Sequence, residues 1–278
     1  MVSVRSIDKF LGQLALEAAI LVSVQSTRGS VPREKGAWMA VFVKDFVGTV
    51  GGGHLEFDAL AIARRRLQGE SGEETVRFAL GPALGQCCGG EVTLRFEPVS
   101  AADVGALAQR LAPEQTPVAL FGGGHVGHAL VNVLAALPFA VTWIDSRDEV
   151  FPQNVSAHVI CEHSDPVHWA VGALAPNSQV LIMSFSHAED LDVVAACLMR
   201  QRLKVDLPFV GLIGSKTKWA SFKHRLQERG FSDDELAHVT CPIGVPGIEG
   251  KEPEVIAVAV AAQLLQTLAA RTALKMPD

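Results

Sequence analysis

The chain has 278 residues, which is enough for two domains of ordinary size. Hydrophobic residues make up 49% of it and charged residues 19%, a composition that excludes a disordered chain. The formal net charge of −6 argues against nucleic acid as the main ligand, and we expect no nucleic-acid partner.

The sequence favours a cytoplasmic protein without a membrane-spanning segment. Asp8 and Glu17 interrupt the N-terminal region in which a signal peptide needs an unbroken apolar core. The longest stretch without a charged residue runs from Gln115 to Ile144, and glycines and Pro138 divide it into short elements. The 5 cysteines form an odd number without the spacing of a disulfide framework, which favours a reducing compartment.

Residues 1–100 predict a mixed α/β domain in which strands and helices do not alternate regularly. A polar loop over residues 26–33 separates the first two expected strands. Residues 101–116 predict a connector with a small alanine-rich helix. The expected elements of this half are helices at Ser6–Ala18 and Leu55–Leu67 and strands at Ala19–Val24, Ala37–Val43, Phe46–Val50, Thr75–Leu80 and Glu91–Glu97.

Residues 117–278 alternate regularly between strands and helices, which predicts a Rossmann-like doubly wound parallel sheet. A long alanine-rich helix is expected from Pro253 onward. Two S-x-x-E segments, beginning at Ser186 and Ser232, match the capping box of a helix start. The other expected elements are strands at Val118–Phe121, Ala140–Ile144, Ala157–Cys161, Gln179–Ser184 and Phe209–Ile213 and helices at His125–Leu137, Pro166–Leu174 and Leu191–Arg200.

A G-x-G-x-x-G motif, formed by Gly122, Gly124 and Gly127, lies between an expected strand and an expected helix. In such a turn the glycines allow a tight bend, the approach of a pyrophosphate and close helix packing. Asp145 ends the next strand, where an acidic residue accepts a hydrogen bond from a ribose hydroxyl. The motif predicts Rossmann topology. Whether an NAD-type dinucleotide binds or the glycines only build the turn stays open at this point.

A second glycine cluster, Gly51 to Gly53, also joins a strand to a helix and would bring bare N–H groups close to a ligand. Glu56 falls in the first turn of that helix, where in the simplest interpretation it complements the helix dipole. The alternative interpretation is a loop that faces a phosphate or a pterin. The residues alone support both interpretations.

Two further segments carry reactive or charged side chains. Cys87 and Cys88 lie in a glycine-rich segment, where they would either present a thiolate to sulfur or metal chemistry or be buried as small apolar residues. Ser215 and Lys216 follow the last clear strand, at the sheet edge where doubly wound folds bind ligands. Lys216 and Lys218 would neutralise an anion there or remain solvated at a helix start. Neither a hydrolase signature nor a zinc-binding motif is present.

Several strings together resemble one family, the xanthine dehydrogenase accessory factor family (XdhC/CoxI). In the first half these are Ser30-Val31-Pro32-Arg33, Gly48-Thr49-Val50-Gly51-Gly52-Gly53-His54-Leu55-Glu56 and Leu84-Gly85-Gln86-Cys87-Cys88-Gly89-Gly90. In the second half they are the Phe121–Gly127 turn, Gly211-Leu212-Ile213-Gly214-Ser215-Lys216, Cys241-Pro242-Ile243-Gly244-Val245-Pro246-Gly247-Ile248 and Gly250-Lys251-Glu252-Pro253. The resemblance covers nearly the whole chain.

The resemblance implies an accessory protein rather than an enzyme. Members of this family bind molybdenum cofactor (molybdopterin), protect it, support its sulfuration by a cysteine desulfurase and insert it into a molybdenum hydroxylase. The partners implied are therefore a cysteine desulfurase and apo-xanthine dehydrogenase. A homodimer is expected from the apolar C-terminal helix.

The resemblance also suggests roles for individual residues. Cys87 or Cys88 would contact the cofactor, Cys87 through its molybdenum, while the Gly51–Gly53 turn and Glu56 would line the site. Arg33, in the polar loop, would pair with the phosphate. The alternative function is an NAD-dependent oxidoreductase that uses the Rossmann turn and Asp145.

Overall fold

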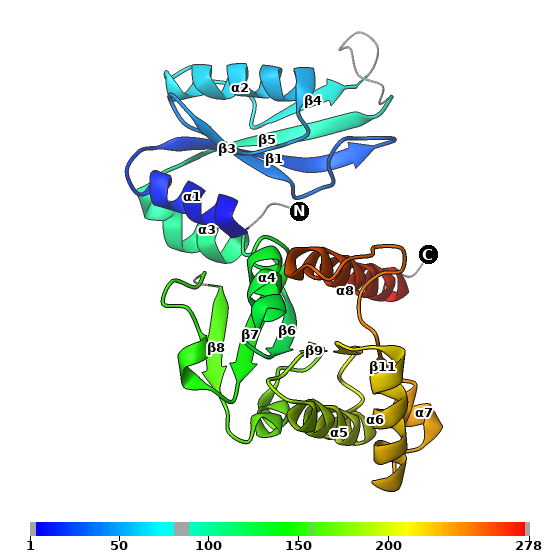
Figure 1. The fold of residues 1–278 in the computed structure, drawn as a ribbon. Coiled ribbons are helices and arrows are strands. Elements are labelled where there is room, and N and C mark those ends of the chain that lie inside the picture. Colours follow the sequence, from blue (N-terminus) through cyan, green and yellow to red (C-terminus); the bar gives the residue numbers. More distant parts are fainter. Residues whose placement is uncertain (1–3, 81–88, 157, 276–278) are drawn as a thin grey trace. The chain divides into compact units, whose positions relative to one another are not determined.

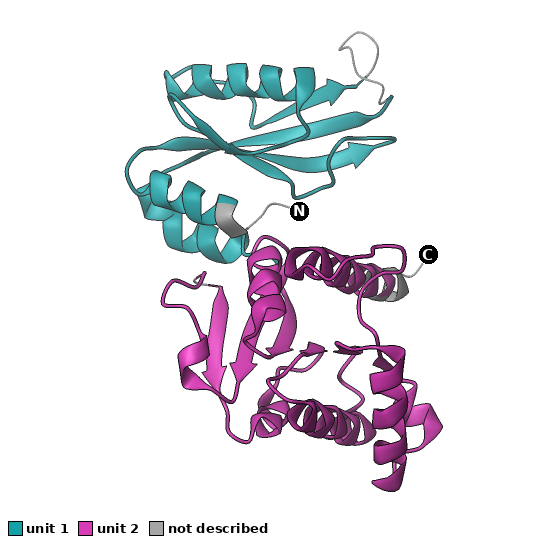
Figure 2. Ribbon diagram, in the orientation of Figure 1, with its two compact units in different colours: residues 1–113 teal, residues 114–278 magenta. Residues whose placement is uncertain are grey.

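The computed structural model describes residues 4–80, 89–156 and 158–275 and divides into two compact units, Met1–Pro113 and Glu114–Asp278 (Figure 2). Most of the expected connector belongs to the first unit. Its helix α3 (Val104–Arg110) contributes the buried Leu107 to a core that it shares with helix α1 (Val4–Leu14).

In the first unit, five described strands form an antiparallel sheet in the order β3-β2-β1-β5-β4 (Figure 1). Alternation along β1 explains the layering, because successive side chains of a strand point to opposite faces. Ile20 and Val22 join the core under helix α2 (Gly53–Leu67), whereas Leu21 joins the core under α1 and α3. The strands are β1 (Ala19–Arg28), β2 (Trp38–Val41), β3 (Phe46–Gly48), β4 (Thr75–Ala79) and β5 (Glu91–Val99).

Strands β2 and β3 are shorter than expected, and two expectations for this unit are wrong at boundaries that matter for the loops. Helix α1 ends at Leu14 rather than Ala18, and Leu16 is exposed in the turn that leads into β1. Strand β1 continues through Arg28, so the first part of the expected polar loop is strand. The ladder with β5 resumes after an irregularity between Val24 and Ser26 and satisfies the backbone groups, although the side chains there are polar and exposed.

In the second unit, six described strands form a parallel sheet in the order β11-β10-β9-β6-β7-β8. This is the strand order of the Rossmann fold, which confirms the predicted doubly wound sheet. The strands are β6 (Thr116–Phe121), β7 (Phe139–Asp145), β8 (Val159–His163), β9 (Gln179–Ile182), β10 (Phe209–Leu212) and β11 (Val239–Thr240).

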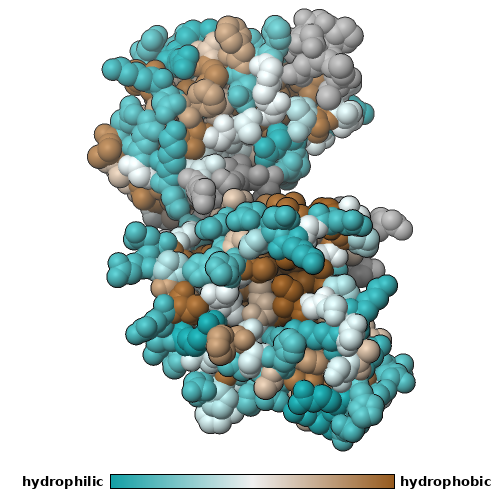
Figure 3. Space-filling view, viewed as in Figure 1, coloured by the Kyte–Doolittle hydropathy of each residue, from teal (hydrophilic) through white to brown (hydrophobic). Residues whose placement is uncertain are grey.

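Helices cover both faces of this sheet (Figure 1). Val118 and Leu120 of β6 pack into the core with α4 and α8, and Ala119 and Phe121 pack into the core with α5, α6 and α7. In the view of Figure 3, apolar residues gather between these two helical layers and polar residues surround them. The helices are α4 (His125–Leu134), α5 (His187–Lys204), α6 (Lys216–Glu228), α7 (Asp233–Leu236) and α8 (Pro253–Lys275).

Several expected elements of the second unit differ from the observed ones by a few residues at their ends, among them α4, β8 and β9, and three differ more clearly. The helix expected at 166–174 is a 3-10 helix, Val167–Ala173. Helix α5 begins at His187 rather than Leu191, because Ser186 caps it by accepting a hydrogen bond from the Glu189 N–H. Strand β11 was not predicted, since two residues give no periodic signal.

Helix α8 is the one helix in the described part of the chain that is long and apolar enough to cross a membrane, judged by length and composition. Ala257, Val260 and Leu264 on this helix are buried. They pack against α4 in the core of the second unit. This packing is typical of the core helix of a globular unit.

The capping box at α7 makes the stability of the second unit depend on pH. Glu235 accepts hydrogen bonds from Arg202, from the Ser232 N–H and from the Ser232 hydroxyl. The hydrogen bond from Arg202 is the largest of the interactions that lower the pKa of Glu235 to about 2, well below the usual range of a glutamate. A lowered folded-state pKa stabilises the fold above the unfolded-state pKa, and this stabilisation is lost as the pH falls through the folded-state value.

We therefore expect Glu235→Gln to flatten the loss of stability of the second unit between about pH 5 and about pH 2. The measurement is urea unfolding at a series of pH values. Asp234→Asn is the matched control, because Asp234 is an exposed neighbour outside the box. Parallel pH profiles for wild type and Glu235→Gln would contradict the assignment.

Candidate functional site

Three segments of the first unit meet at the glycine loop. A Cβ atom on Gly51 would lie 2.5 Å from Cγ of Pro32, so the polar loop lies directly against the glycine turn. A Cβ atom on Gly90 would lie 2.3 Å from the carbonyl oxygen of Ser30 and 2.6 Å from that of Arg28. Only residues without a side chain allow the Pro32 ring and the backbone of residues 28–30 to approach so closely. Cys87 and Cys88 lie outside the described residues.

The carboxylate of Glu56 organises the glycine loop. Its Oε2 accepts hydrogen bonds from the Thr49 hydroxyl at 2.5 Å and from the N–H groups of Val50 and Gly52 at 3.3 Å. Thr49 in turn accepts from the Gly51 N–H at 3.2 Å. Glu56 and Thr49 therefore occupy donors of the loop itself, which is a structural role beyond a simple interaction with the helix dipole.

The donors that remain at this loop are at the start of α2. Gly52 is the N-cap residue, and no side chain of the described residues caps the helix. Within the described part of the chain, the N–H groups of Gly53 and His54 have no hydrogen-bond partner. Free N–H groups and the positive end of the helix dipole favour an anion at this position.

Arg33 is a cationic side chain of the adjoining loop. Its side chain is 20% exposed, and its Nε lies 3.6 Å from Oε2 of Glu34. Its Nη2 is buried and makes no hydrogen bond with any described residue. A buried guanidinium nitrogen without an acceptor is costly, so this side chain fits an anionic ligand.

The second unit has its own glycine turn, at the carboxyl ends of β6 and β9 where the strand order reverses. A Cβ atom on Gly122 would lie 2.0 Å from the carbonyl oxygen of Met183, and one on Gly127 would lie 2.2 Å from the carbonyl oxygen of Gly122. A Cβ atom on Gly124 would meet nothing within 4 Å. Gly122 and Gly127 are thus required for packing, whereas Gly124 borders open space at the start of α4.

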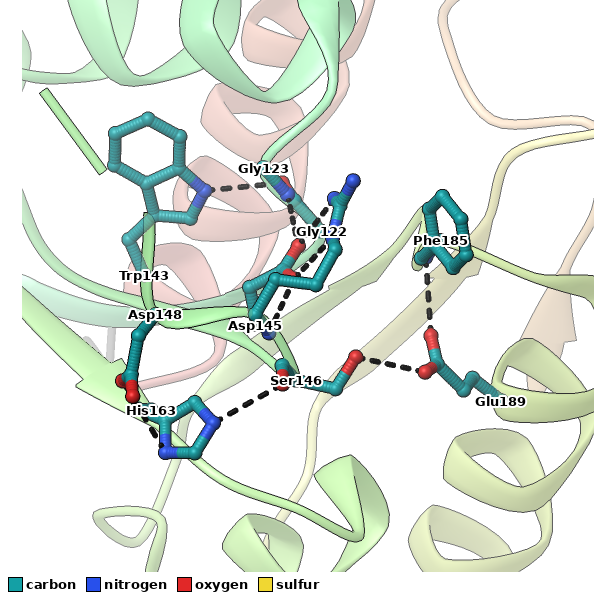
Figure 4. A network of polar contacts seen from close by, with 10 residues as sticks. Gly122, Gly123, Trp143, Asp145, Ser146, Asp148, His163, Phe185 and Glu189 are labelled. Carbon is teal, nitrogen blue, oxygen red and sulfur yellow. Dashed lines mark hydrogen bonds and ion pairs between the residues drawn. The ribbon is translucent and has the colours of Figure 1, made fainter. Parts of the chain in front are cut away.

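Asp145 lies at the end of β7, beside the glycine turn (Figure 4). Its side chain is 1% exposed. Oδ2 accepts from the Gly123 N–H at 2.6 Å and from Nη2 of Arg147 at 3.0 Å. Oδ1 accepts from the N–H of Arg147 at 2.9 Å and from its Nε at 2.8 Å. The carboxylate thus accepts four hydrogen bonds, which fills its capacity, so a ribose hydroxyl would have to displace one of these donors.

These contacts decide the charge of Asp145. Burial raises the pKa of a carboxyl group, but the hydrogen bonds from Arg147 and Gly123 outweigh burial here and lower the pKa of Asp145. The hydrogen bond to Asp145 raises the pKa of Arg147 in turn. The two residues therefore form an ionised pair at neutral pH.

Further polar contacts tie the ends of β7, β8 and β9 together (Figure 4). Glu189 accepts from the Ser146 hydroxyl at 2.7 Å and from the Phe185 N–H at 3.1 Å. The expected capping box at Ser186 is consequently half formed, because the carboxylate that would complete it is used by these neighbours. His163 lies between the Asp148 carboxylate and the Ser146 carbonyl oxygen.

Ser215 and Lys216 begin helix α6. The Ser215 hydroxyl caps the helix by accepting from the Lys218 N–H at 3.1 Å, while the Lys216 side chain is exposed. The solvated interpretation is wrong for Lys218. Its Nζ lies 2.6 Å from Oδ2 of Asp190 and 2.8 Å from the Ile213 carbonyl oxygen, and the two side chains are 12% and 3% exposed.

Sequence reasoning missed several residues of this edge, chiefly Arg147, Ser184 and Asp190. The available signal for Arg147 was an arginine two residues after the acid of a Rossmann motif. Ser184 and Asp190 gave no signal, because only the fold brings them next to the turn. The described residues contain no group of three or more His, Cys, Asp or Glu side chains that could hold a metal ion.

Comparisons with known proteins place both units in one family. Residues 14–79 match the family described as "XdhC and CoxI family", and residues 118–264 match "XdhC Rossmann domain". "Uncharacterized protein YqeB" of Escherichia coli (strain K12) is 24% identical over 254 residues, which are 88% of this chain and 43% of that protein. The chain therefore spans less than half the length of this curated relative.

A solved structure described as a xanthine dehydrogenase from Bacillus halodurans has the same fold. It superposes with a TM-score of 0.76 over 98% of both chains, at 20% sequence identity. The likeness extends over both units. From the two family matches and the motifs of both halves, we conclude that this chain belongs to the XdhC family.

Proposed function

We propose that this protein is an accessory factor that binds molybdenum cofactor, protects it, supports its sulfuration and delivers it to a molybdenum hydroxylase of the xanthine dehydrogenase type. Family membership of both units supports the accessory role. The cofactor, the cysteine desulfurase and apo-xanthine dehydrogenase enter the proposal through the family resemblance.

The observation that carries the proposal is the Arg33 side chain in the first unit. Its buried Nη2 has no acceptor among the described residues, and Pro32, its neighbour in the chain, packs on Gly51 of the glycine turn. Next to this turn, the N–H groups of Gly53 and His54 are free within the described structure. A cation and helix N–H groups in one loop cluster are the donors that a phosphate monoester needs.

These residues fit one end of molybdenum cofactor, an anionic pterin with a phosphate and a dithiolene. Arg33 and the start of α2 would hold the phosphate, while Glu56 and Thr49 keep the loop in shape. Cys87 or Cys88 would contact the molybdenum end, as the family resemblance implies. The molybdenum chemistry is supplied by the cofactor when bound, and the chain binds, orients and shields it.

Arg33→Ala should weaken retention of the cofactor at least tenfold, because a hydrogen bond to a charged group contributes about 1.5–3 kcal/mol. The protein is incubated anaerobically with free molybdenum cofactor and desalted, and bound molybdenum and pterin are then measured. Arg33→Lys should retain partial binding, since it keeps the charge but loses the planar donor fork.

Arg28→Ala is the matched control. It removes an arginine from the end of β1 in the same polar segment, where the side chain is exposed. Retention by this variant should equal that of wild type. Equal retention by Arg33→Ala and wild type would remove Arg33 from the site.

A further inference from the structure

The carboxyl edge of the second unit has a ligand-binding geometry that the accessory role does not use. The chain leaves β6 through Gly122 to Gly124 and leaves β9 through Ser184 and Phe185, on either side of the point where the strand order reverses. In doubly wound sheets ligands bind at this point.

The glycine turn offers a place for a pyrophosphate. Among the residues that the structure describes, no side chain caps the start of α4 after Gly124, and none lies within 4 Å of the place where a Gly124 Cβ atom would stand. The helix therefore begins beside open space at Gly124, where first-turn N–H groups and the positive end of the helix dipole favour an anion.

A second, independent observation at this edge is an unsatisfied hydroxyl. Ser184 Oγ is buried and has no hydrogen-bond partner in the described structure. The residue lies beside the turn, because its N atom is 3.0 Å from the place where a Gly122 Cβ would stand. The large majority of buried polar side-chain atoms in proteins have a hydrogen-bond partner, so the Ser184 hydroxyl points to a ligand or a bound water.

Arg147 decides which ligand fits at the end of β7. Its Nε and one Nη2 hydrogen bind Asp145, which leaves three of its five guanidinium hydrogens without a partner among the described residues. The guanidinium carbon lies 4.4 Å from the ring centre of Phe185, and this stacking holds the group in place. With its side chain 39% exposed, Arg147 presents these donors to a ligand.

The charge of this pair differs from that of an NAD site. NAD-binding Rossmann folds present a free carboxylate to the ribose hydroxyls, whereas an arginine nearby accommodates a ribose 2′-phosphate. Here hydrogen bonds from Gly123 and Arg147 use the acceptor positions of the Asp145 carboxylate, and the free donors belong to Arg147. A phosphate on the ribose satisfies these donors, and an unmodified ribose does not.

We propose that the second unit binds a 2′-phosphorylated adenine dinucleotide of the NADP(H) class, with its pyrophosphate at Gly124 and its 2′-phosphate on Arg147. This inference is independent of the cofactor site in the first unit.

The test compares the affinities of NADP⁺ and NAD⁺ for the full-length chain by titration calorimetry. Wild type should bind NADP⁺ at least about tenfold more tightly than NAD⁺. Arg147→Ala should reduce this preference to about twofold or invert it, because the freed Asp145 can then accept from a ribose hydroxyl. Arg225→Ala, which removes an exposed arginine from α6, should leave both affinities unchanged.

A further variant and a further ligand complete the test. Gly124→Val should weaken both nucleotides, because its side chain would fill the place of the pyrophosphate, and its unfolding curve shows whether the unit remains folded. Coenzyme A carries a pyrophosphate and a 3′-phosphate on its ribose, so tighter binding of coenzyme A than of NADP⁺ would overturn the dinucleotide assignment.

Equal affinity for NADP⁺ and NAD⁺, no binding of either at about 1 mM, or an unchanged preference in Arg147→Ala would overturn the proposal. Retention of molybdenum cofactor by Arg147→Ala is measured in parallel and should equal wild type. A failure of the nucleotide proposal is thereby separated from a failure of the proposed function.

Discussion

Gly122→Ala should destabilise the second unit by about 3 kcal/mol, because it combines backbone strain with overpacking. Gly122 has φ of +120°, a conformation that L-residues rarely adopt. Its new Cβ would lie 2.0 Å from the carbonyl oxygen of Met183 and 2.5 Å from the carbonyl carbon. Both atoms belong to the backbone that follows β9, so the clash is relieved only if the edge of the sheet itself moves.

Gly124→Ala is the matched control, two residues further along the same turn. Gly124 has φ of −77°, and its Cβ would meet nothing within 4 Å. This variant should therefore change the unfolding free energy by less than about 0.5 kcal/mol. Hydrogen exchange of the β6 and β9 amides in urea reports on this unit separately from the first. Equal destabilisation by both substitutions would contradict the packing assigned to Gly122.

Arg200→Ala should cost about 3–5 kcal/mol, the range for removing one partner of a buried ion pair. Arg200 lies on α5 with its side chain 6% exposed. It donates to the carbonyl oxygens of Val171 and Leu174 at 2.7 and 2.8 Å and to both carboxylate oxygens of Asp206. The hydrogen bond from Arg200 lowers the pKa of Asp206, so the variant would leave a charged carboxylate and two carbonyl groups without this donor.

Arg202→Ala provides the comparison on the same helix. Arg202 pairs with Glu235 and lies over the ring of Phe231, but its side chain is 43% exposed. Solvent screens such a pair, so the loss should be much smaller than for Arg200→Ala. The measurement is again urea unfolding followed through the amides of the second unit. Similar losses of unfolding free energy in the two variants would show that the buried contacts of Arg200 contribute no more than the exposed pair of Arg202.

The sequence was sufficient to predict the fold of the second unit. The spacing of Gly122, Gly124 and Gly127 after a strand, with Asp145 at the end of the next strand, defines a Rossmann turn, and the observed strand order agrees. The family strings covered both units, and two family matches confirm them. These signals are local, so a single sequence carries them.

The remaining features depend on tertiary contacts. Residues 26–28 form strand because β5 offers backbone partners, although their side chains predict a loop. Lys218 is mostly shielded from solvent and pairs at 2.6 Å with Asp190 of α5, a contact that no spacing in the sequence encodes. Glu189 accepts a hydrogen bond from Ser146, 43 residues away, and does not complete the capping box of Ser186.

In the candidate sites, too, local sequence signals were predictable and tertiary contacts were not. Arg33 was predicted from its place in the polar loop near the glycine run, and the Gly51–Gly53 turn from its glycines and its family string. The structure adds the close contact between Pro32 and Gly51 that joins the two segments. Asp145 lies where the motif predicted. Its engagement by Arg147 and Gly123 depends on side-chain geometry, which the motif does not specify.

The most direct test of the proposed function follows molybdenum cofactor through binding and transfer. The wild-type protein and the double variant Cys87→Ala/Cys88→Ala are loaded anaerobically, desalted and mixed with apo-xanthine dehydrogenase and a cysteine desulfurase. Wild type should retain molybdenum and pterin near stoichiometrically and activate about one hydroxylase site per cofactor released, whereas the double variant should retain little. Absence of retention by wild type, or catalytic turnover of a nicotinamide without release of cofactor, would contradict it and favour the oxidoreductase alternative.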